Sequence, residues 1–231
     1  MLRSFIIGGK MEKLMLLENI IRQLYAVDEL QGYAEGEIHF LKELFGALPR
    51  VLEDFYRAAG NTEVIHHVQD SWMLPENFRK WKWLQTSDHM ILLNENQGVC
   101  RAGIRREDLV LSDPPVYSTE DDKTWVICAP TTSEFLAAAL AYESAFTFTY
   151  NPEEFYWLTG EEMEQIQSQL TKYPFELQSW ISDMKITFYS NEPDNLVAVM
   201  DCGDLQMLYG AASEVSYSKL MDVMEGIGEP I

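Results

Sequence analysis

The residue types that can do chemistry are most concentrated in the stretch NENQGVC at positions 94–100. It places a carboxylate (Glu95), three carboxamides and a thiol (Cys100) within a few positions of one another. A cysteine becomes a nucleophile when a nearby base takes its proton, but no histidine lies close to Cys100 in the sequence. Three roles are therefore open for this stretch: a catalytic site, an edge that binds a partner, and a turn.

Other patterns that carry chemistry are missing from the sequence. It has neither of the glycine patterns that cradle phosphates, and no Gly-x-Ser-x-Gly motif around a serine nucleophile. The four histidines, His39, His66, His67 and His89, do not form the His-Glu-x-x-His spacing that binds zinc. With 37 acidic residues, some pair of carboxyl groups will always lie at a distance that suits glycoside hydrolysis. The presence of acidic pairs therefore does not indicate that activity. We expect no catalytic residues, no metal, no cofactor and no enzymatic activity.

The charge balance is strongly acidic, with 17 basic against 37 acidic residues and a formal net charge of -20. Such a field repels nucleic acids and anionic membrane surfaces and favours a basic partner. The surplus is concentrated at the C-terminal end, where residues 151–231 hold three basic and fifteen acidic residues. Part of it serves solubility alone.

Cysteine usage and hydropathy point to the cytoplasm. Cys100, Cys128 and Cys202 are odd in number, widely spaced and not arranged as Cys-x-x-Cys, which suits a reducing compartment. We expect all three to be small buried apolar residues. The apolar runs are too short for a signal peptide or a membrane span.

The elements that must position these residues can be predicted from periodicity. Apolar residues three and four apart predict helices over Met11–Tyr25, through Ile38–Phe45 and over Arg50–Ala59, with Gly60–Asn61 as a left-handed cap. Thr131 with Glu134, and Thr159 with Glu162, have the spacing of capping boxes, and each predicts a helix start. A last helix is expected over Val215–Met224.

Strands are predicted in both halves of the chain. Met90–Leu93 and Val99–Ile104 form a hairpin with its turn at Asn96–Gly98, and Trp125–Cys128 is a short buried strand. Prolines make 113–115 irregular. Three further runs, separated by polar turns, predict a meander: Lys185–Ser190, Leu196–Met200 and Leu205–Tyr209.

Taken in order, these segments resemble the SUKH superfamily, which joins the yeast cell-wall-assembly regulator to many bacterial immunity proteins. The resemblance covers roughly residues 38–147 and rests on Leu48-Pro49, Phe55-Tyr56, Gly60-Asn61, Gln69-Asp70, Leu74-Pro75, Glu95 to Cys100, Asp113 to Tyr117, Trp125 and Ser133 to Leu136. The order of the Glu95–Gly98 and Asp113–Pro115 elements is the most specific part.

The resemblance implies an α+β fold with a mixed, mostly antiparallel sheet flanked by helices. Residues 1–37 would be an N-terminal helical segment, residues 38–150 the SUKH-like core, and residues 151–231 a C-terminal α/β extension packed on the same sheet or continuing it. It implies a cytoplasmic, non-enzymatic immunity protein that binds and neutralises a toxin domain, often one that acts on nucleic acids. The alternative is an intracellular scaffold or regulatory interaction module.

Tight binding of a basic toxin needs a desolvated aromatic anchor inside an acidic rim. Two groups fit this description: Tyr117 with Glu120, Asp121 and Asp122, and Tyr156 and Trp157 with Glu153 and Glu154. For each group the alternative is a core aromatic residue beneath solvated charges. Trp81 and Trp83, which alternate with Lys80 and Lys82, also have the mixture found at interfaces, although half-buried indoles on a strand or turn would look the same.

Under this interpretation the opening stretch is structural. Side chains of Glu95, Asn96 and Gln97 would hydrogen-bond to neighbouring backbone groups and fix the hairpin, while Gly98 permits the turn. Asp113, Pro114 and Pro115 form the second structural motif.

Overall fold

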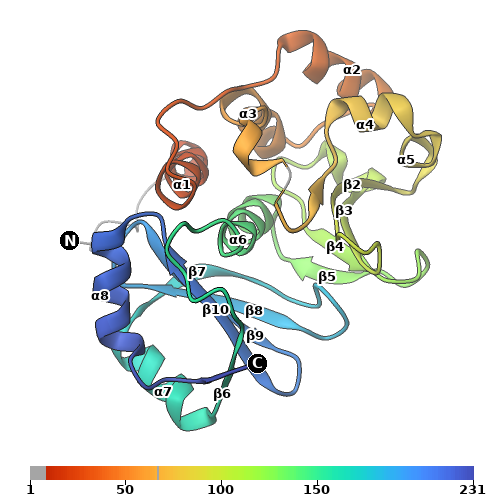
Figure 1. Ribbon diagram of the computed structural model, residues 1–231. Coiled ribbons are helices and arrows are strands. Elements are labelled where there is room, and N and C mark those ends of the chain that lie inside the picture. Colours follow the sequence, from red (N-terminus) through yellow and green to blue (C-terminus); the bar gives the residue numbers. More distant parts are fainter. Residues whose placement is uncertain (1–8, 67) are drawn as a thin grey trace.

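Helix α6 (Thr132–Ser144) lies at the centre of the fold because its sequence, TSEFLAAALAYES, is apolar or small on nearly every side. Of its residues, all but Glu134 are buried. The computed structural model describes residues 9–66 and 68–231, and in it α6 is packed between the N-terminal helices and two β-sheets (Figure 1).

The N-terminal helices pack around α6 and over the first sheet. They are α1 (Gly9–Leu24), α2 (Glu35–Phe45), α3 (Arg50–Ala58), α4 (Pro75–Lys80) and α5 (Lys82–Thr86), with short 3₁₀ turns η1 (Glu63–Ile65) and η2 (Arg106–Val110). In α1 the apolar residues Leu17, Ile21 and Leu24 are buried at the predicted helical spacing, and this helix packs against α6 and α3.

The first sheet has five antiparallel strands in the order β1-β2-β3-β4-β5. They are β1 (Ser71–Trp72), β2 (His89–Asn94), β3 (Arg101–Arg105), β4 (Val116–Thr119) and β5 (Val126–Ala129). The predicted hairpin is confirmed as β2 and β3, and Gly98 in its turn has φ +74°, a value that favours glycine.

The second sheet is built from the C-terminal part of the chain, in the order β11-β6-β10-β9-β8-β7. Its elements are β6 (Tyr156–Leu158), α7 (Gly160–Gln169), β7 (Thr171–Leu177), β8 (Lys185–Ser190), β9 (Asn195–Asp201), β10 (Leu205–Ala211), α8 (Glu214–Met224) and β11 (Glu229–Pro230). Strands β8, β9 and β10 confirm the predicted meander.

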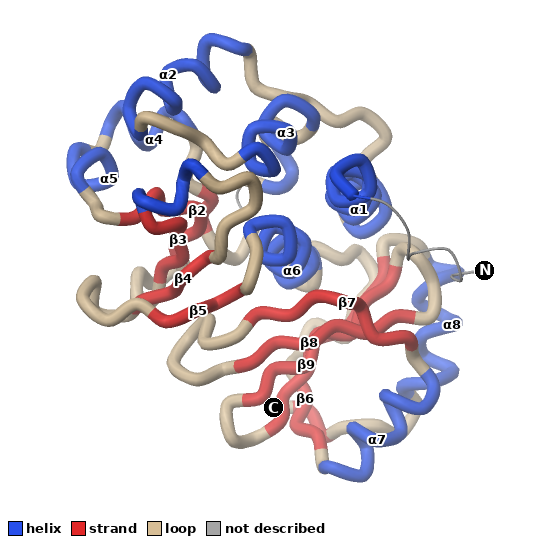
Figure 2. Tube along the Cα trace, turned by 180° about the vertical axis from the view of Figure 1, so that it is seen from behind, coloured by secondary structure: helices blue, strands red, loops and turns tan. Residues whose placement is uncertain are grey.

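Both faces of the second sheet are covered, so its central strand β9 is apolar from Leu196 to Met200. Leu196 and Ala198 of β9 face the core shared with α6, whereas Val197 and Val199 face a smaller core under α7 and α8. Figure 2 shows α7 and α8 on the side of this sheet away from α6.

The predicted α+β class is confirmed, but the sheet differs from the expected one. Two separate sheets replace a single mixed sheet, and every strand pairing among the described residues is antiparallel. The sheets meet where the Gln178 amide donates to the Cys128 carbonyl at 2.8 Å.

Three local predictions were wrong. Gly60 is not a left-handed cap; it is required because a Cβ there would lie 2.7 Å from Cδ1 of Tyr56. Strand β5 is not buried throughout, because it forms an edge where Val126 and Ile127 are 44% and 52% exposed. Cys202 is exposed, whereas Cys100 and Cys128 are buried.

In the described part of the chain, no helix combines the length and the apolar character needed to cross a membrane.

Candidate functional site

The outer face of the first sheet, away from α6, carries a group of aromatic and arginine side chains. Alternation along β3 places Arg101 and Arg105 on this face, and the strand register sets Tyr117 and His89 beside them. We call this group the sheet-face cluster; it consists of Trp83, His89, Arg101, Arg105, Tyr117 and Trp125.

Each arginine of the sheet-face cluster lies over an aromatic ring. The guanidinium carbon of Arg105 is 4.6 Å from the ring centroid of Tyr117, and that of Arg101 is 5.0 Å from the ring of Trp83. Such cation–π contacts hold the flexible arginines in place. Trp83 remains 43% exposed, so the contact surface is open to solvent.

His89 lies beneath this layer. Its ring stacks on Trp125 with centroids 3.6 Å apart and meets Tyr117 edge-on at 6.0 Å. Neither ring nitrogen has a hydrogen-bond partner among the described residues. Burial, and then the positive charge of Arg105, lower the His89 pKa to about 4, so the ring is neutral at pH 7.

Acidic residues surround the sheet-face cluster. Asp122 pairs with Arg101 and Glu107 with Arg105, both at 3.3 Å and both with largely exposed carboxylates. Asp88 and Asp108 lie near His89. Each arginine of the cluster is thus paired with a carboxylate, and Asp88 and Asp108 add two further acidic groups near this face.

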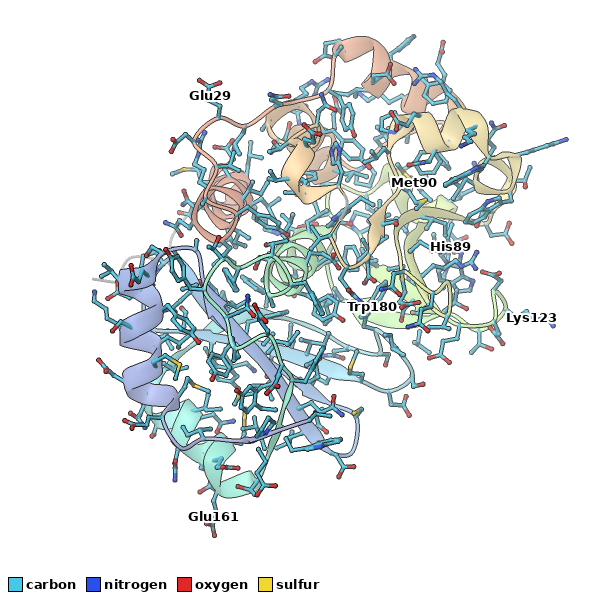
Figure 3. All side chains as sticks on the ribbon, in the orientation of Figure 1. Glu29, His89, Met90, Lys123, Glu161 and Trp180 are labelled. Carbon is cyan, nitrogen blue, oxygen red and sulfur yellow. The ribbon has the colours of Figure 1, made fainter. Side chains whose placement is uncertain are left out.

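The structure gives the members of the first predicted partner-binding group different roles. Asp121 accepts hydrogen bonds from the Thr124 and Lys123 amides at 2.7 and 2.9 Å, which lower its pKa to about 2 and give it a structural part in the β4–β5 turn. Glu120 accepts a hydrogen bond from the Ser182 amide. Tyr117 and Asp122 are the members that belong to the outer face, and Lys123 projects from the same turn (Figure 3).

The second predicted group lies on the other sheet. Tyr156 packs against Tyr209 with ring centroids 5.6 Å apart, whereas Trp157 is 39% exposed. Glu153 and Glu154 are exposed in the loop before β6. The structure therefore does not bring the two groups together: β4 belongs to the first sheet and β6 to the second (Figure 1).

The hairpin motif depends on Glu95. Its carboxylate is buried and accepts hydrogen bonds from the Gln97 and Val99 amides at 2.9 and 3.1 Å, which closes the turn. The side chains of Asn96 and Gln97 differ from expectation: both residues are exposed, and no hydrogen bond from either side chain is found among the described residues.

Asp113 joins three parts of the chain. Its carboxylate accepts from the Ser133 amide at 2.8 Å and hydroxyl at 2.7 Å, at the start of α6, and pairs with Lys13 of α1 at 2.6 Å. The Pro114 carbonyl accepts from Thr132 at 2.8 Å. Pro115 follows directly and leads into β4. This motif thus holds the N-terminus of the central helix.

The thiol of Cys100 is not activated as a nucleophile in this fold. Cys100 is 1% exposed, its thiol donates to the Trp180 carbonyl, and burial raises its pKa to about 12, so it stays protonated. Among the described residues no group of three His, Cys, Asp or Glu side chains could hold a metal. His67 lies outside the described residues.

An open groove of about 370 Å³ lies between the start of α6 and the edge strand β7. Its acid Glu176 is neutralised by Lys172 at 3.1 Å and Lys185 at 2.8 Å. Pro174 has no amide proton to offer an added strand. The groove is therefore a weaker candidate than the outer sheet face.

Sequence reasoning identified Tyr117 and Asp122 but missed His89, Arg101, Arg105 and Trp125 as their neighbours. The available signal was the pattern Arg-x-Gly-x-Arg at 101–105, which places both arginines on one face of a strand. The stack of His89 on Trp125 joins residues 36 positions apart and left no local pattern. Comparison of the chain with protein-family models, curated proteins and solved structures found no match.

Proposed function

We propose that this protein is a non-enzymatic immunity protein, which binds a toxin domain through the outer face of its first sheet and blocks it stoichiometrically. The sequence resemblance to the SUKH superfamily suggests this role. The observation that supports it is the sheet-face cluster, a partly exposed layer of tryptophan, tyrosine and arginine with acidic residues paired to its arginines.

The composition of this face suits a binding hot spot. Tryptophan, tyrosine and arginine are the residues most enriched where truncation weakens a complex. Here the rings and guanidinium groups already contact one another. The ring centroids of His89 and Trp125 are 3.6 Å apart, and the guanidinium carbon of Arg105 is 4.6 Å from the ring centroid of Tyr117. A partner would therefore immobilise few additional rotamers, which reduces the entropic cost of binding.

The charge supports a basic partner. A net charge of -20 attracts a positively charged domain and raises its association rate, an effect that salt weakens. A toxin that cleaves or modifies nucleic acid needs a basic cleft, and an acidic protein can cover it.

The test begins with the product of a neighbouring gene that encodes a secreted protein with a C-terminal toxin domain. We expect the two proteins to co-purify and toxin activity to be abolished at an equimolar ratio. Absence of binding would count against the proposal. Several endogenous partners without protection against the toxin would instead favour a scaffold or regulatory module.

Substitution then locates the interface. Tyr117→Ala and Arg105→Ala should each cost about 2 kcal/mol of binding, roughly a 30-fold rise in Kd. Trp157→Ala on the second sheet is the matched control, because it also truncates a half-exposed aromatic side chain. Equal weakening by Trp157→Ala, or none by the other two, would place the interface elsewhere.

A further inference from the structure

Two carboxyl groups lie side by side in the core, away from the sheet-face cluster. Glu143 of α6 is 0% exposed and Asp70, in the loop before β1, is 2% exposed. An isolated buried carboxylate is costly, so each oxygen has to be accounted for.

One oxygen of each carboxyl is satisfied by backbone amides. Oε2 of Glu143 accepts from the amides of Gln69 at 3.0 Å and Asp70 at 2.9 Å, and Oδ1 of Asp70 accepts from the Asn96 amide at 3.1 Å. The other two oxygens, Oε1 of Glu143 and Oδ2 of Asp70, are buried without a hydrogen-bond donor among the described residues. The two side chains are within hydrogen-bonding reach of each other, so a proton on one can bond to the other.

The pair forms no salt bridge within the described residues. The titratable groups that face it are Tyr25 of α1, Tyr142 of α6, Glu95 of the β2–β3 turn, and Cys100 at the end of that turn. The tyrosines and the thiol are neutral at pH 7, because burial raises each pKa above its ordinary value. Burial likewise raises the pKa of Glu143, with repulsion from Asp70 as the second cause, and burial raises that of Asp70.

Trp180 connects the pair to the second sheet. It belongs to the loop of residues 178–184 between β7 and β8 and is fully buried between the sheets (Figure 3). Its indole nitrogen faces Asp70 but has no hydrogen-bond partner among the described residues. Cys100, directly before β3, donates to the carbonyl of Trp180, and Ser118 of β4 donates to the carbonyl of Ser179 in this loop. Ser179 and Ser182 have φ of +50° and +52°, a conformation that non-glycine residues adopt at a cost and that these contacts hold.

We propose that Asp70 and Glu143 hold one proton between them at neutral pH, and that this proton keeps the loop 178–184 docked against the first sheet. Loss of the proton to solvent leaves two negative charges in contact in the core, beside Glu95. Their repulsion is relieved when the loop and Trp180 withdraw and water enters. The proposal does not depend on the proposed function.

The direction of the pH effect follows from the raised pKa values. The folded protein holds the proton at pH values where an unfolded chain has released it, so the pair favours folding most in mild acid. This contribution falls as the pH rises above the ordinary carboxyl pKa of about 4.3 and through the raised values, by up to tenfold in the folding equilibrium per pH unit for each of the two carboxyl groups.

Infrared spectroscopy can detect the shared proton directly. At pH 7 the wild-type protein should show the carbonyl band of one protonated carboxyl that is missing in difference spectra from Glu143→Gln and from the double variant Asp70→Asn/Glu143→Gln. In the wild type alone, the band should persist well above pH 5 and disappear in alkali. A wild-type spectrum without a protonated carboxyl at pH 7 would overturn the proposal, even if both variants fail to fold.

Hydrogen exchange tests the link to the loop. Glu143→Gln mimics the protonated state, because its amide can donate to Asp70 at any pH. Amide exchange in residues 178–184, corrected for the intrinsic rate, should rise with pH in the wild type by up to tenfold per pH unit and stay level in Glu143→Gln. Trp180→Phe should raise exchange at every pH and leave the infrared band in place. An equal rise with pH in the wild type and in Glu143→Gln would show that the proton does not hold the loop.

Discussion

His89 shows how one residue can be shaped by neighbours from distant parts of the chain. An unpaired imidazole in water would titrate near pH 6.5. Here Trp125 covers one face of the ring, Tyr117 meets its edge, and Arg105 adds a positive charge nearby. Burial by these rings and the charge of Arg105 favour the neutral form of the imidazole.

Acid should therefore destabilise the fold through His89. The folded-state pKa of about 4 is below the ordinary value, so the unfolded chain binds more protons between pH 6.5 and 4. The contribution is present above pH 6.5 and is lost as the pH falls towards 4. His89→Phe keeps an aromatic ring against Trp125 but cannot titrate. Urea midpoints measured from pH 7 to pH 4 should fall more steeply for the wild type, and parallel curves would rule out this role for His89.

At the scale of elements, the two predicted capping boxes differ: both hydrogen bonds form at the start of α7, but only one forms at the start of α6. Thr159 and Glu162 form both halves of the capping box of α7, with bonds of 3.3 and 2.8 Å, and Glu162 also accepts from the Gly228 amide at 2.8 Å. At α6, the Thr131 side chain accepts from the Glu134 amide at 3.2 Å, which is only one half of the predicted box. At α6 the Asp113 carboxylate, which accepts from the Ser133 amide at 2.8 Å, and burial along the whole helix take the place of the missing half.

Loss of the α7 cap should be measurable. Thr159→Ala removes the acceptor for the Glu162 amide, and we expect it to lower the free energy of unfolding by about 1 kcal/mol. Thr159→Ser, which keeps the hydroxyl, is the matched control and should lie close to wild type. The measurement is urea unfolding followed by circular dichroism. A similar loss for both variants would mean that the methyl group, and not the cap, matters.

Elements with a strong local pattern were predictable, and those fixed by tertiary contacts were not. The meander was found because β8, β9 and β10 are apolar runs between polar turns. Strand β7 was missed because it is an edge strand with Lys172, Pro174 and Glu176 in its sequence and an irregular register between Lys172 and Glu176. For the same reason only part of the candidate site could be predicted. Tyr117 lies close in sequence to three acidic residues, whereas the residues that contact His89 lie on or next to other strands and are set by the pairing of the sheet.

At the scale of the whole molecule, the two sheets share one core. A single cluster of buried residues includes Met90 and Ile104 of the first sheet, Phe135 of α6, and Ile186 and Phe188 of the second sheet. The division at residue 150 that the resemblance implies therefore runs beside a helix whose buried surface belongs to both sides. Neither sheet can lose α6 without exposing apolar surface to water.

The chain should accordingly unfold in one step. Five of the six tryptophans, Trp72, Trp81, Trp83, Trp125 and Trp180, lie in the first sheet, its helices or the loop that docks on it, so fluorescence reports mainly on that half. Far-ultraviolet circular dichroism reports on both sheets. With a shared core we expect the two signals to give the same urea midpoint and slope, as two-state unfolding requires. Trp157→Phe removes the one tryptophan of the second sheet and should leave the agreement unchanged. Separate midpoints would show that the C-terminal sheet is an independent unit, and that α6 stays folded with only one of its neighbours.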